Sequence, residues 1–207
     1  EIEVNRDVLV PRPETEILAE LAWTWLAGQP PLTQRAPQAL DWGTGSGCLA
    51  LAIASHHPTA RLHAVDLSPA SLEVARRNAS RLGVADRVAF VLSDGVDALP
   101  QDLRFHLVVA NPPYIPSDDI QALQPEVRDH DPKLALDGGP DGLDYYRRIA
   151  VTLPPRLESS GTLMLEFGDD QASAISDILA GAGWSVSRIV RDLSGRERFL
   201  VAEFHRT

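Results

Sequence analysis

The sequence contains a single cysteine and no long apolar run, and both scarcities exclude classes of protein. Cys48 alone cannot form an internal disulfide, which excludes a disulfide-stapled fold and suits a reducing compartment. No apolar stretch approaches the roughly 20 residues of a membrane span, and no signal-peptide pattern opens the chain. We therefore expect a soluble, cytoplasmic protein that does not associate with a membrane.

Positive charge is also scarce. Nineteen basic side chains stand against 29 acidic ones, which gives a net charge of −10. Such a surface disfavours direct binding to nucleic-acid phosphates and favours a small cationic ligand. The six histidines and the cysteine show no metal-ligand spacing, so we expect no metal site. Hydrophobic residues at 44% and charged residues at 23% are typical of a globular domain with a sizeable core.

The N-terminal part, residues 1–37, is predicted to be a strand and helix segment that leads into the main domain, residues 38–207. Glu1 to Val4 reads as part of a strand, so we expect that an upstream part of the natural protein is missing. After Pro13, an amphipathic helix is predicted from Glu14 to Ala27, with Gly28 ending it. A linker is predicted over residues 28–38.

Within the main domain, strand patterns alternate with helix patterns, which indicates an α/β fold with a mostly parallel sheet and right-handed crossovers. A long loop, Pro112 to Gly142, interrupts the alternation, and loops of that length are commonly lids or binding loops. The last two strands are predicted to form an antiparallel hairpin at the sheet edge. The predicted strands are Ala39–Trp42, Arg61–Val65, Arg87–Leu92, Phe105–Ala110, Thr162–Phe167, Trp184–Val190 and Phe199–Phe204. The predicted helices are Cys48–Ser55, Pro69–Leu82 with Ser68 as N-cap, Leu143–Leu153 and Asp170–Ala182.

A glycine-rich turn follows the first strand of the main domain. In Gly43-Thr44-Gly45-Ser46-Gly47, the missing side chains let a ligand touch the backbone. Asp66 ends the next strand, where a carboxylate can accept from two ribose hydroxyls, so a nucleoside-containing cofactor is predicted. The NAD fingerprint requires a third glycine where Cys48 stands. S-adenosylmethionine, which has no pyrophosphate, fits the turn better, and Asp94 could accept from its adenine amino group.

The sequence Asn111-Pro112-Pro113-Tyr114 closes a buried strand. Each proline fixes φ and removes a backbone donor, so the carbonyls around this corner are free to accept from another group. An amide oxygen, a carbonyl and a flat ring suit a planar nitrogen-bearing group. The other interpretation is an ordinary Pro-Pro turn, but the long loop that starts here favours a functional site.

Five segments together resemble the peptide-chain release factor glutamine methyltransferases, essentially from end to end. They are Val10-Pro11-Arg12-Pro13-Glu14-Thr15-Glu16, the glycine turn, the corner at residues 111–114, Gly138-Gly139-Pro140-Asp141-Gly142-Leu143 and Leu165-Glu166-Phe167-Gly168. The first and fourth are the most specific, and the first differs in the sister family that modifies a ribosomal-protein glutamine.

The resemblance implies a Rossmann-like class I S-adenosylmethionine-dependent methyltransferase with a seven-stranded, mostly parallel sheet and a C-terminal antiparallel hairpin. It implies S-adenosylmethionine as donor, S-adenosylhomocysteine as product, and the glutamine of the Gly-Gly-Gln motif in release factors as substrate. It also implies a small N-terminal helical domain that helps hold the release factor, and we expect this upstream domain to be absent from the sequence. We expect a monomer whose partners are release factors.

Two residues depart from the family pattern. Gly95 stands where a tryptophan that packs on the cofactor is common, so adenine stacking must be weaker or come from elsewhere. Asp131, preceded by His130, stands where a glutamate before proline is usual. Both departures concern cofactor affinity rather than the reaction.

The expected chemistry places Asn111, Pro112 and Tyr114 in catalytic roles. The Asn111 Oδ1 atom and the Pro112 carbonyl would accept the two N–H bonds of the substrate amide, while Tyr114 stacks on its face. Pro113 completes the substrate-binding corner, and Asn111 also borders the cofactor. The sequence leaves two alternative functions open: an amino-methyltransferase acting on adenine or guanine in nucleic acid, and a non-catalytic nucleotide-binding module.

Overall fold

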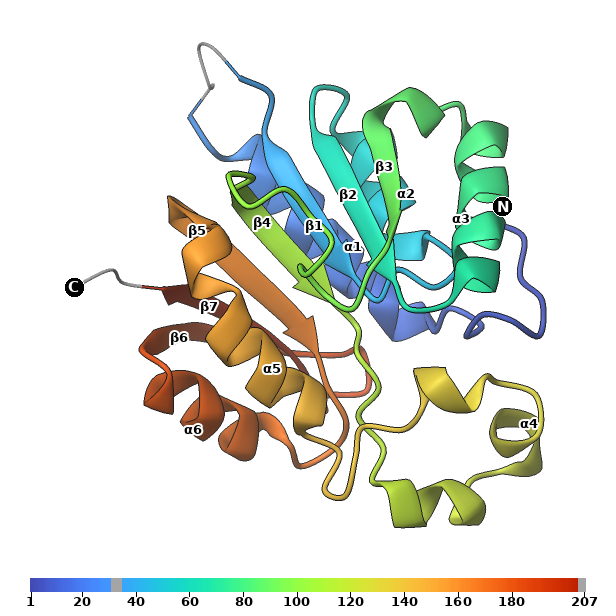
Figure 1. The fold of residues 1–207 in the computed structure, drawn as a ribbon. Coiled ribbons are helices and arrows are strands. Elements are labelled where there is room, and N and C mark those ends of the chain that lie inside the picture. The colour runs from blue at the N-terminus through green and yellow to red at the C-terminus, as the bar shows by residue number, and fades with distance from the viewer. Residues whose placement is uncertain (31–34, 205–207) are drawn as a thin grey trace.

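The computed structural model of the protein describes residues 1–30 and 35–204. In these residues seven strands form one sheet in the order β3-β2-β1-β4-β5-β7-β6, with helices on both faces (Figure 1). This confirms the predicted α/β class. The strands are β1 Gln38–Trp42, β2 Arg61–Asp66, β3 Val88–Leu92, β4 Phe105–Ala110, β5 Leu157–Glu166, β6 Trp184–Arg191 and β7 Glu197–Phe204.

The helices follow the predicted alternation closely. The α-helices are α1 Pro13–Ala27, α2 Cys48–His56, α3 Pro69–Leu82, α4 Pro125–Arg128, α5 Asp144–Thr152 and α6 Ala172–Gly181. Short 3₁₀ helices are η1 Ala85–Arg87, η2 Ser117–Ala122, η3 Lys133–Ala135 and η4 Pro154–Arg156. Helix α3 shows why the local prediction succeeds: the Ser68 side chain accepts from the Ser71 backbone N–H, Pro69 occupies the first turn, and Gly83 ends the helix with a positive φ of 69°.

The first five strands of the sheet order run parallel, and β7 pairs antiparallel with both β5 and β6. The predicted hairpin therefore lies at the edge of the sheet, with β6 outermost. Strands β2 and β3 lie on one side of β1, whereas β4 and β5 lie on the other side. The order of the strands in the sheet therefore reverses between β1 and β4. Ligands of parallel α/β sheets bind at the carboxyl ends of the strands beside such a reversal.

The sheet separates two layers of core. Helices α1, α2 and α3 cover one face, and helices α5 and α6 cover the other (Figure 1). Successive residues of β1 point to opposite faces. Asp41 faces α2, where it bonds the Ala50 backbone N–H, and Trp42 belongs to the core beneath α5. The end of β1 thus supplies one polar and one aromatic side chain to the carboxyl edge of the sheet.

The predicted strand at Glu1 to Val4 is wrong. This segment pairs with no strand in the described residues; instead, Asn78 of α3 bonds the backbone of Glu3, with Nδ2 donating to its carbonyl at 2.9 Å. The backbone of this segment therefore lies beside α3 rather than in the sheet. Helix α1 is amphipathic as predicted: its buried residues include Leu18, Ala22 and Leu26, whereas Ile17, Leu21 and Trp25 are only partly buried.

Of the linker predicted over residues 28–38, residues 31–34 lie outside the described residues. The loop predicted from Pro112 to Gly142 contains η2, α4 and η3, which the sequence reading did not anticipate. Strand β5 also begins earlier than predicted, at Leu157. Among the described residues, no helix is both long and apolar enough to cross a membrane.

Candidate functional site

The glycine turn connects β1 to α2 and is held by Asp41. The Asp41 Oδ2 atom accepts from the Thr44 hydroxyl at 2.6 Å and from the Ala50 backbone N–H at 3.1 Å. Burial raises the pKa of this carboxyl to about 6. Gly43 and Gly45 have positive φ and no atom within 4 Å of a Cβ built on them, so their backbone faces open space. The fixed turn therefore leaves room for a ligand against its backbone.

The other turn residues are placed differently. The side chains of Thr44 and Ser46 are buried, and the Ser46 carbonyl accepts from Asn78. At Gly47, a Cβ would lie 3.0 Å from Leu51 Cδ1 and 3.2 Å from Ala75 Cβ, so this glycine permits helix packing beneath the turn.

Asp66 ends β2 directly beside the turn. Its Oδ2 atom accepts from the Gly45 backbone N–H at 2.8 Å, and its Oδ1 atom accepts from the Ser68 N–H at 2.8 Å. Burial raises the pKa of the carboxyl, while these backbone donors oppose the shift. Each carboxylate oxygen keeps a second lone pair, so Asp66 is oriented and can still accept from a ligand hydroxyl.

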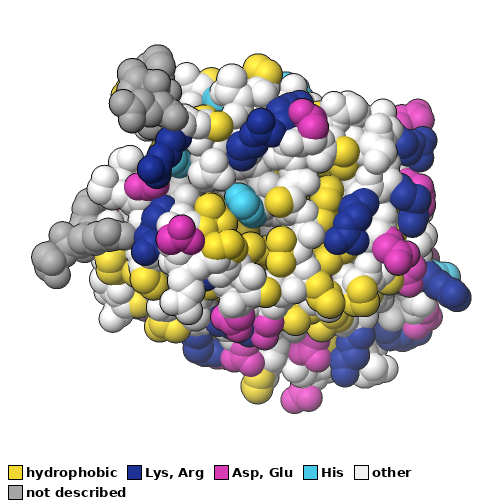
Figure 2. Space-filling model, turned by 45° about the horizontal axis from the view of Figure 1, so that its top comes forward, with side chains coloured by type: hydrophobic (Ala, Val, Ile, Leu, Met, Phe, Trp, Pro, Cys, Tyr) yellow, Lys and Arg dark blue, Asp and Glu magenta, His cyan; other side chains and the backbone are white. Residues whose placement is uncertain are grey.

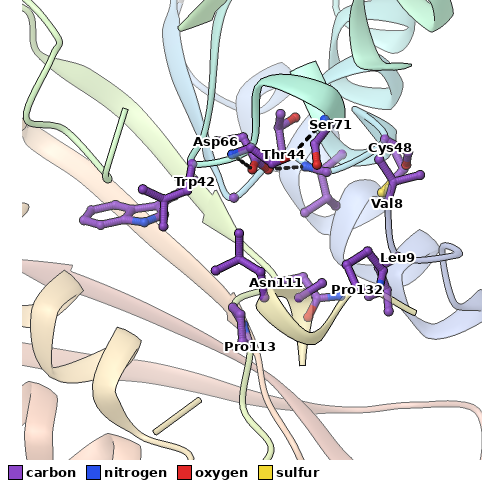
Figure 3. A pocket seen from close by; sticks show the side chains of 18 of the residues that line it. Val8, Leu9, Trp42, Thr44, Cys48, Asp66, Ser71, Asn111, Pro113 and Pro132 are labelled. Carbon is purple, nitrogen blue, oxygen red and sulfur yellow. Dashed lines mark hydrogen bonds between the residues drawn. The ribbon is translucent and has the colours of Figure 1, made fainter. Parts of the chain in front are cut away.

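A cavity of about 280 Å³ lies along this edge of the sheet. Figure 3 shows Asp66 and Thr44 on one side of it and Asn111 and Pro113 on the other. Residues of the N-terminal segment and of the long loop also border it. Its lining includes Val8, Leu9, Trp42, Gly43, Gly45, Asp66, Ser93, Asp94, Gly95, Asn111, Pro113, Pro132 and Tyr145.

An ion pair joins the two segments that border the cavity from outside the sheet. The Arg12 Nη2 atom lies 2.6 Å from Asp131 Oδ2, although the two residues are 119 apart in sequence. The Asp131 side chain is only 4% exposed. The aspartate that departs from the family pattern therefore has a defined partner within the Pro-Arg-Pro-Glu-Thr-Glu segment.

A second cavity, of about 250 Å³, meets the first at Asn111. Its lining is mainly apolar, with Arg12 as its charged member. Pro112 and Tyr114 line this second cavity, Pro113 lines the first, and Asn111 lines both. The predicted corner therefore lies between two separate spaces, one beside the glycine turn and one beneath the long loop.

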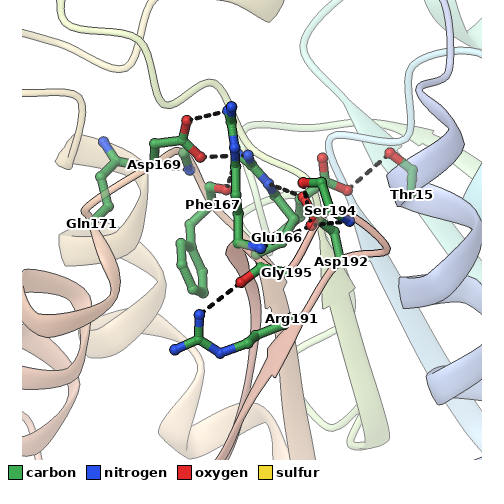
Figure 4. Close-up of polar contacts among 12 residues, drawn as sticks. Thr15, Glu166, Phe167, Asp169, Gln171, Arg191, Asp192, Ser194 and Gly195 are labelled. Carbon is green, nitrogen blue, oxygen red and sulfur yellow. Dashed lines mark hydrogen bonds and ion pairs between the residues drawn. The ribbon is translucent and has the colours of Figure 1, made fainter.

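The Asn111 side chain is oriented by two residues that lie far from it in sequence. The Thr15 hydroxyl donates to Glu166 Oε2 at 2.9 Å (Figure 4), and Asn111 Nδ2 donates to Thr15 Oγ1 at 3.2 Å. Because the single hydroxyl proton is directed at Glu166, Thr15 can only accept from Asn111. No group in the described part of the chain donates to Asn111 Oδ1. The amide oxygen is therefore the free acceptor at the junction.

Glu166, at the end of β5, is almost fully buried, and burial raises the pKa of its carboxyl to about 7. The Thr15 hydroxyl opposes this shift by bonding the charged form. Thr15 and Glu166 belong to two of the segments that carry the family resemblance, but no role or contact of either residue could be defined from the sequence. Neither spacing nor composition could show that residues 15, 111 and 166 meet.

The backbone of the corner is fixed by close contacts with glycines. A Cβ on Gly138 would lie 2.8 Å from the Pro113 carbonyl oxygen, and one on Gly142 would lie 2.3 Å from the Tyr114 carbonyl oxygen. Gln171 Nε2 donates to the same Tyr114 oxygen at 2.9 Å. Gly138 and Gly142 thus let the segment at residues 138–143 pack directly on the corner.

Two further candidates have contacts that limit their roles. Asp94 lines the first cavity, and its carboxylate pairs with Arg148 of α5. Burial raises the pKa of the Cys48 thiol to about 12, so the thiol is protonated near neutral pH. Within the described ranges, no cluster of three or more acidic, histidine or cysteine residues could hold a metal ion.

The sequence matches the family described as Methyltransferase small domain over residues 29–127. A release factor glutamine methyltransferase from Cereibacter sphaeroides is 45% identical over 96% of this chain, which spans 68% of that relative. Another from Rhodospirillum rubrum is 44% identical over 98% of this chain, which spans 60% of that relative.

Solved structures share the fold at low sequence identity. A ribosomal protein L11 methylase from Lactobacillus delbrueckii subsp. bulgaricus aligns with a TM-score of 0.64 and 22% identity, covering 94% of this chain and 81% of that one. The N-terminal domain of human METTL16, in complex with SAH, aligns with a TM-score of 0.69 and 15% identity, covering 100% and 76%. The predicted class I methyltransferase fold is confirmed, and the chain belongs to the release factor glutamine methyltransferase family.

Proposed function

We propose that this protein transfers a methyl group from S-adenosylmethionine to the side-chain amide nitrogen of the glutamine in the Gly-Gly-Gln motif of peptide chain release factors, in the cytoplasm. The observation that carries the proposal is the position of Asn111. Its side chain borders both cavities, and its amide oxygen is the free acceptor between them.

The first cavity fits the cofactor. The backbone of Gly43 and Gly45 faces open space, as close approach of a ligand requires, and the oriented Asp66 carboxylate can accept from ribose hydroxyls. S-adenosylmethionine supplies an electrophilic methyl group on a sulfonium cation, which a chain of net charge −10 favours. The product would be S-adenosylhomocysteine.

The second cavity is suited to the substrate side chain. A glutamine amide nitrogen is a poor nucleophile because its lone pair is delocalised into the carbonyl. Asn111 Oδ1 and the Pro112 carbonyl accept its two N–H bonds and aim the nitrogen at the first cavity, while the Tyr114 ring packs on the amide face. Orientation of this kind can supply about 7–11 kcal/mol of the barrier. The proton leaves after methyl transfer, when the nitrogen is far more acidic.

The decisive test is Asn111→Ala, assayed with labelled donor and a purified release factor. Methyl transfer should be abolished, because the substrate amide loses its acceptor. Binding of S-adenosylhomocysteine, measured by calorimetry, should stay within about threefold. Wild-type turnover by the variant would remove Asn111 from the mechanism.

The second candidate function is methylation of an adenine or guanine amino group in nucleic acid, which would use the same corner. It is disfavoured by the net charge of −10. On the face turned forward in Figure 2, which is the side of the strands' amino ends in Figure 1, acidic and basic side chains are interspersed. Labelled donor offered with a release factor or with an RNA pool separates the two. Label on the RNA alone would favour the alternative.

A further inference from the structure

The indole ring of Trp42 occupies the space that a side chain at position 95 would take. A Cβ built on Gly95 would lie 2.1 Å from Trp42 Cζ2 and 2.4 Å from Cη2, far inside van der Waals contact. Gly95 also has a positive φ of 60°. Residue 95 is therefore restricted to glycine for two reasons: its own backbone conformation, and the aromatic ring from β1 with which a side chain there would collide.

Trp42 is 3% exposed, yet it lines the first cavity together with Ser93, Asp94 and Gly95. In Figure 3 its ring extends to the opposite end of the view from Val8, Leu9 and Pro132. Its indole N–H has no hydrogen-bond partner among the described residues, whereas Trp184 Nε1 donates to the Ala150 carbonyl at 2.9 Å. A buried tryptophan usually finds such a partner. Trp42 therefore offers the cavity both an aromatic ring and a free donor.

The part of the ligand that reaches Trp42 follows from two fixed points. With the ribose at Asp66, one end of the nucleoside must reach Asn111, where the second cavity begins. The base then extends the other way, toward Ser93 to Gly95 and the indole. The inference rests on the proposed function, because it takes the ligand to be S-adenosylmethionine.

We infer that Trp42 supplies the aromatic wall of the adenine subsite in this protein. Residues 42 and 95 form a reciprocal pair in which the large aromatic side chain comes from β1 and the glycine comes from the segment after β3. Gly95 has no side chain that could stack on the adenine, and the Trp42 ring from β1 supplies that stacking surface instead.

Substitutions that remove the Trp42 ring, or place an aromatic ring at position 95 instead, test whether it binds the adenine. Calorimetric titration with S-adenosylhomocysteine should show binding about tenfold weaker for Trp42→Leu, equivalent to about 1.4 kcal/mol. Trp42→Phe, which keeps an aromatic ring, should stay within about threefold of the wild type. Trp42→Leu combined with Gly95→Trp should recover most of the lost affinity, whereas Gly95→Trp alone should bind weakly because two rings compete for one space.

A matched glycine control separates the collision from backbone strain. Gly83 has a similar positive φ of 69° and no atom within 4 Å of a built Cβ. Gly83→Ala should therefore keep wild-type affinity. Gly95→Ala should weaken binding, since the indole must move. Thermal melts of all variants report folding separately from binding.

The outcomes distinguish this inference from the proposed function. If the wild-type chain binds no S-adenosylhomocysteine, the proposed cofactor is wrong. If the wild type binds and folded Trp42→Leu keeps affinity within about twofold, the adenine wall is not Trp42. The same conclusion follows if Trp42→Leu with Gly95→Trp folds but binds no better than Trp42→Leu, because a purely structural role predicts no recovery.

Discussion

The two halves of the site are held in place by contacts of different range. The glycine turn is fixed by neighbours: Asp41 bonds residues 3 and 9 positions away, and Asp66 bonds Gly45 across 21 positions. The corner at Asn111 depends on contacts that span 96 residues to Thr15, and Thr15 in turn bonds Glu166 across 151 residues.

This difference shows which parts of such a site a sequence can reveal. When a turn is held by residues close to it in sequence, those residues form a recognisable local motif. When a side chain is oriented by distant elements, the sequence shows only which residue it is, and its partners become known only from the fold. Three substitutions test whether the distant contacts have separate effects from the local ones.

The largest expected effect is on stability, from Glu166→Gln. The folded-state pKa of Glu166 is about 7, above its ordinary value of 4.5, because the carboxyl is buried. Between these pH values the folded protein holds a proton that the unfolded chain has lost, so the free energy of unfolding falls as pH rises. In the wild type this decrease in the free energy of unfolding should be about 3 kcal/mol between pH 4.5 and pH 7, and in Glu166→Gln it should be absent.

Urea unfolding of both proteins across this pH range provides the measurement. Asp41, whose pKa is also raised by burial, contributes a similar slope to both proteins and cancels from the difference. Parallel pH profiles for the two proteins would show that Glu166 is not the titrating group.

The second effect is on turnover, from Thr15→Val. The variant keeps the volume but removes the hydroxyl, so Asn111 Nδ2 loses its Thr15 acceptor and the amide is less firmly oriented. We expect kcat to fall about 30-fold, or about 2 kcal/mol, with S-adenosylhomocysteine binding unchanged. Thr15→Ser restores the hydroxyl and should restore kcat. A loss of affinity with normal kcat would place Thr15 in the cofactor half instead.

The smallest effect is on affinity, from Asp66→Ala. Loss of the ribose acceptor should weaken S-adenosylhomocysteine binding about tenfold in a calorimetric titration. Because Asp66 also accepts from Gly45 and Ser68, a lower melting temperature should accompany it. If affinity is unchanged, the ribose role is wrong and the two halves are not separable in this way.

Most helices and strands were predictable because their signals are local. Strand β4 and helix α3 have the predicted bounds, each given by an apolar run or by capping residues. The errors arose where a distant element decided the outcome. Glu1 to Val4 has strand-like alternation, but Asn78 binds the segment to α3. Likewise, the space beside Gly95 is occupied by the ring of Trp42 from β1, which no pattern around residue 95 indicates.

The position of β7 has a consequence for synthesis of the protein. It lies between β5 and β6, and Phe199 pairs with Glu166 at the end of β5. A ribosome delivers residues 197–204 after every other described strand, and domains form progressively as the chain emerges. A nascent chain can therefore assemble its glycine turn early, but the surroundings of Glu166, and with them the orientation of Asn111, are completed only when the last strand has inserted.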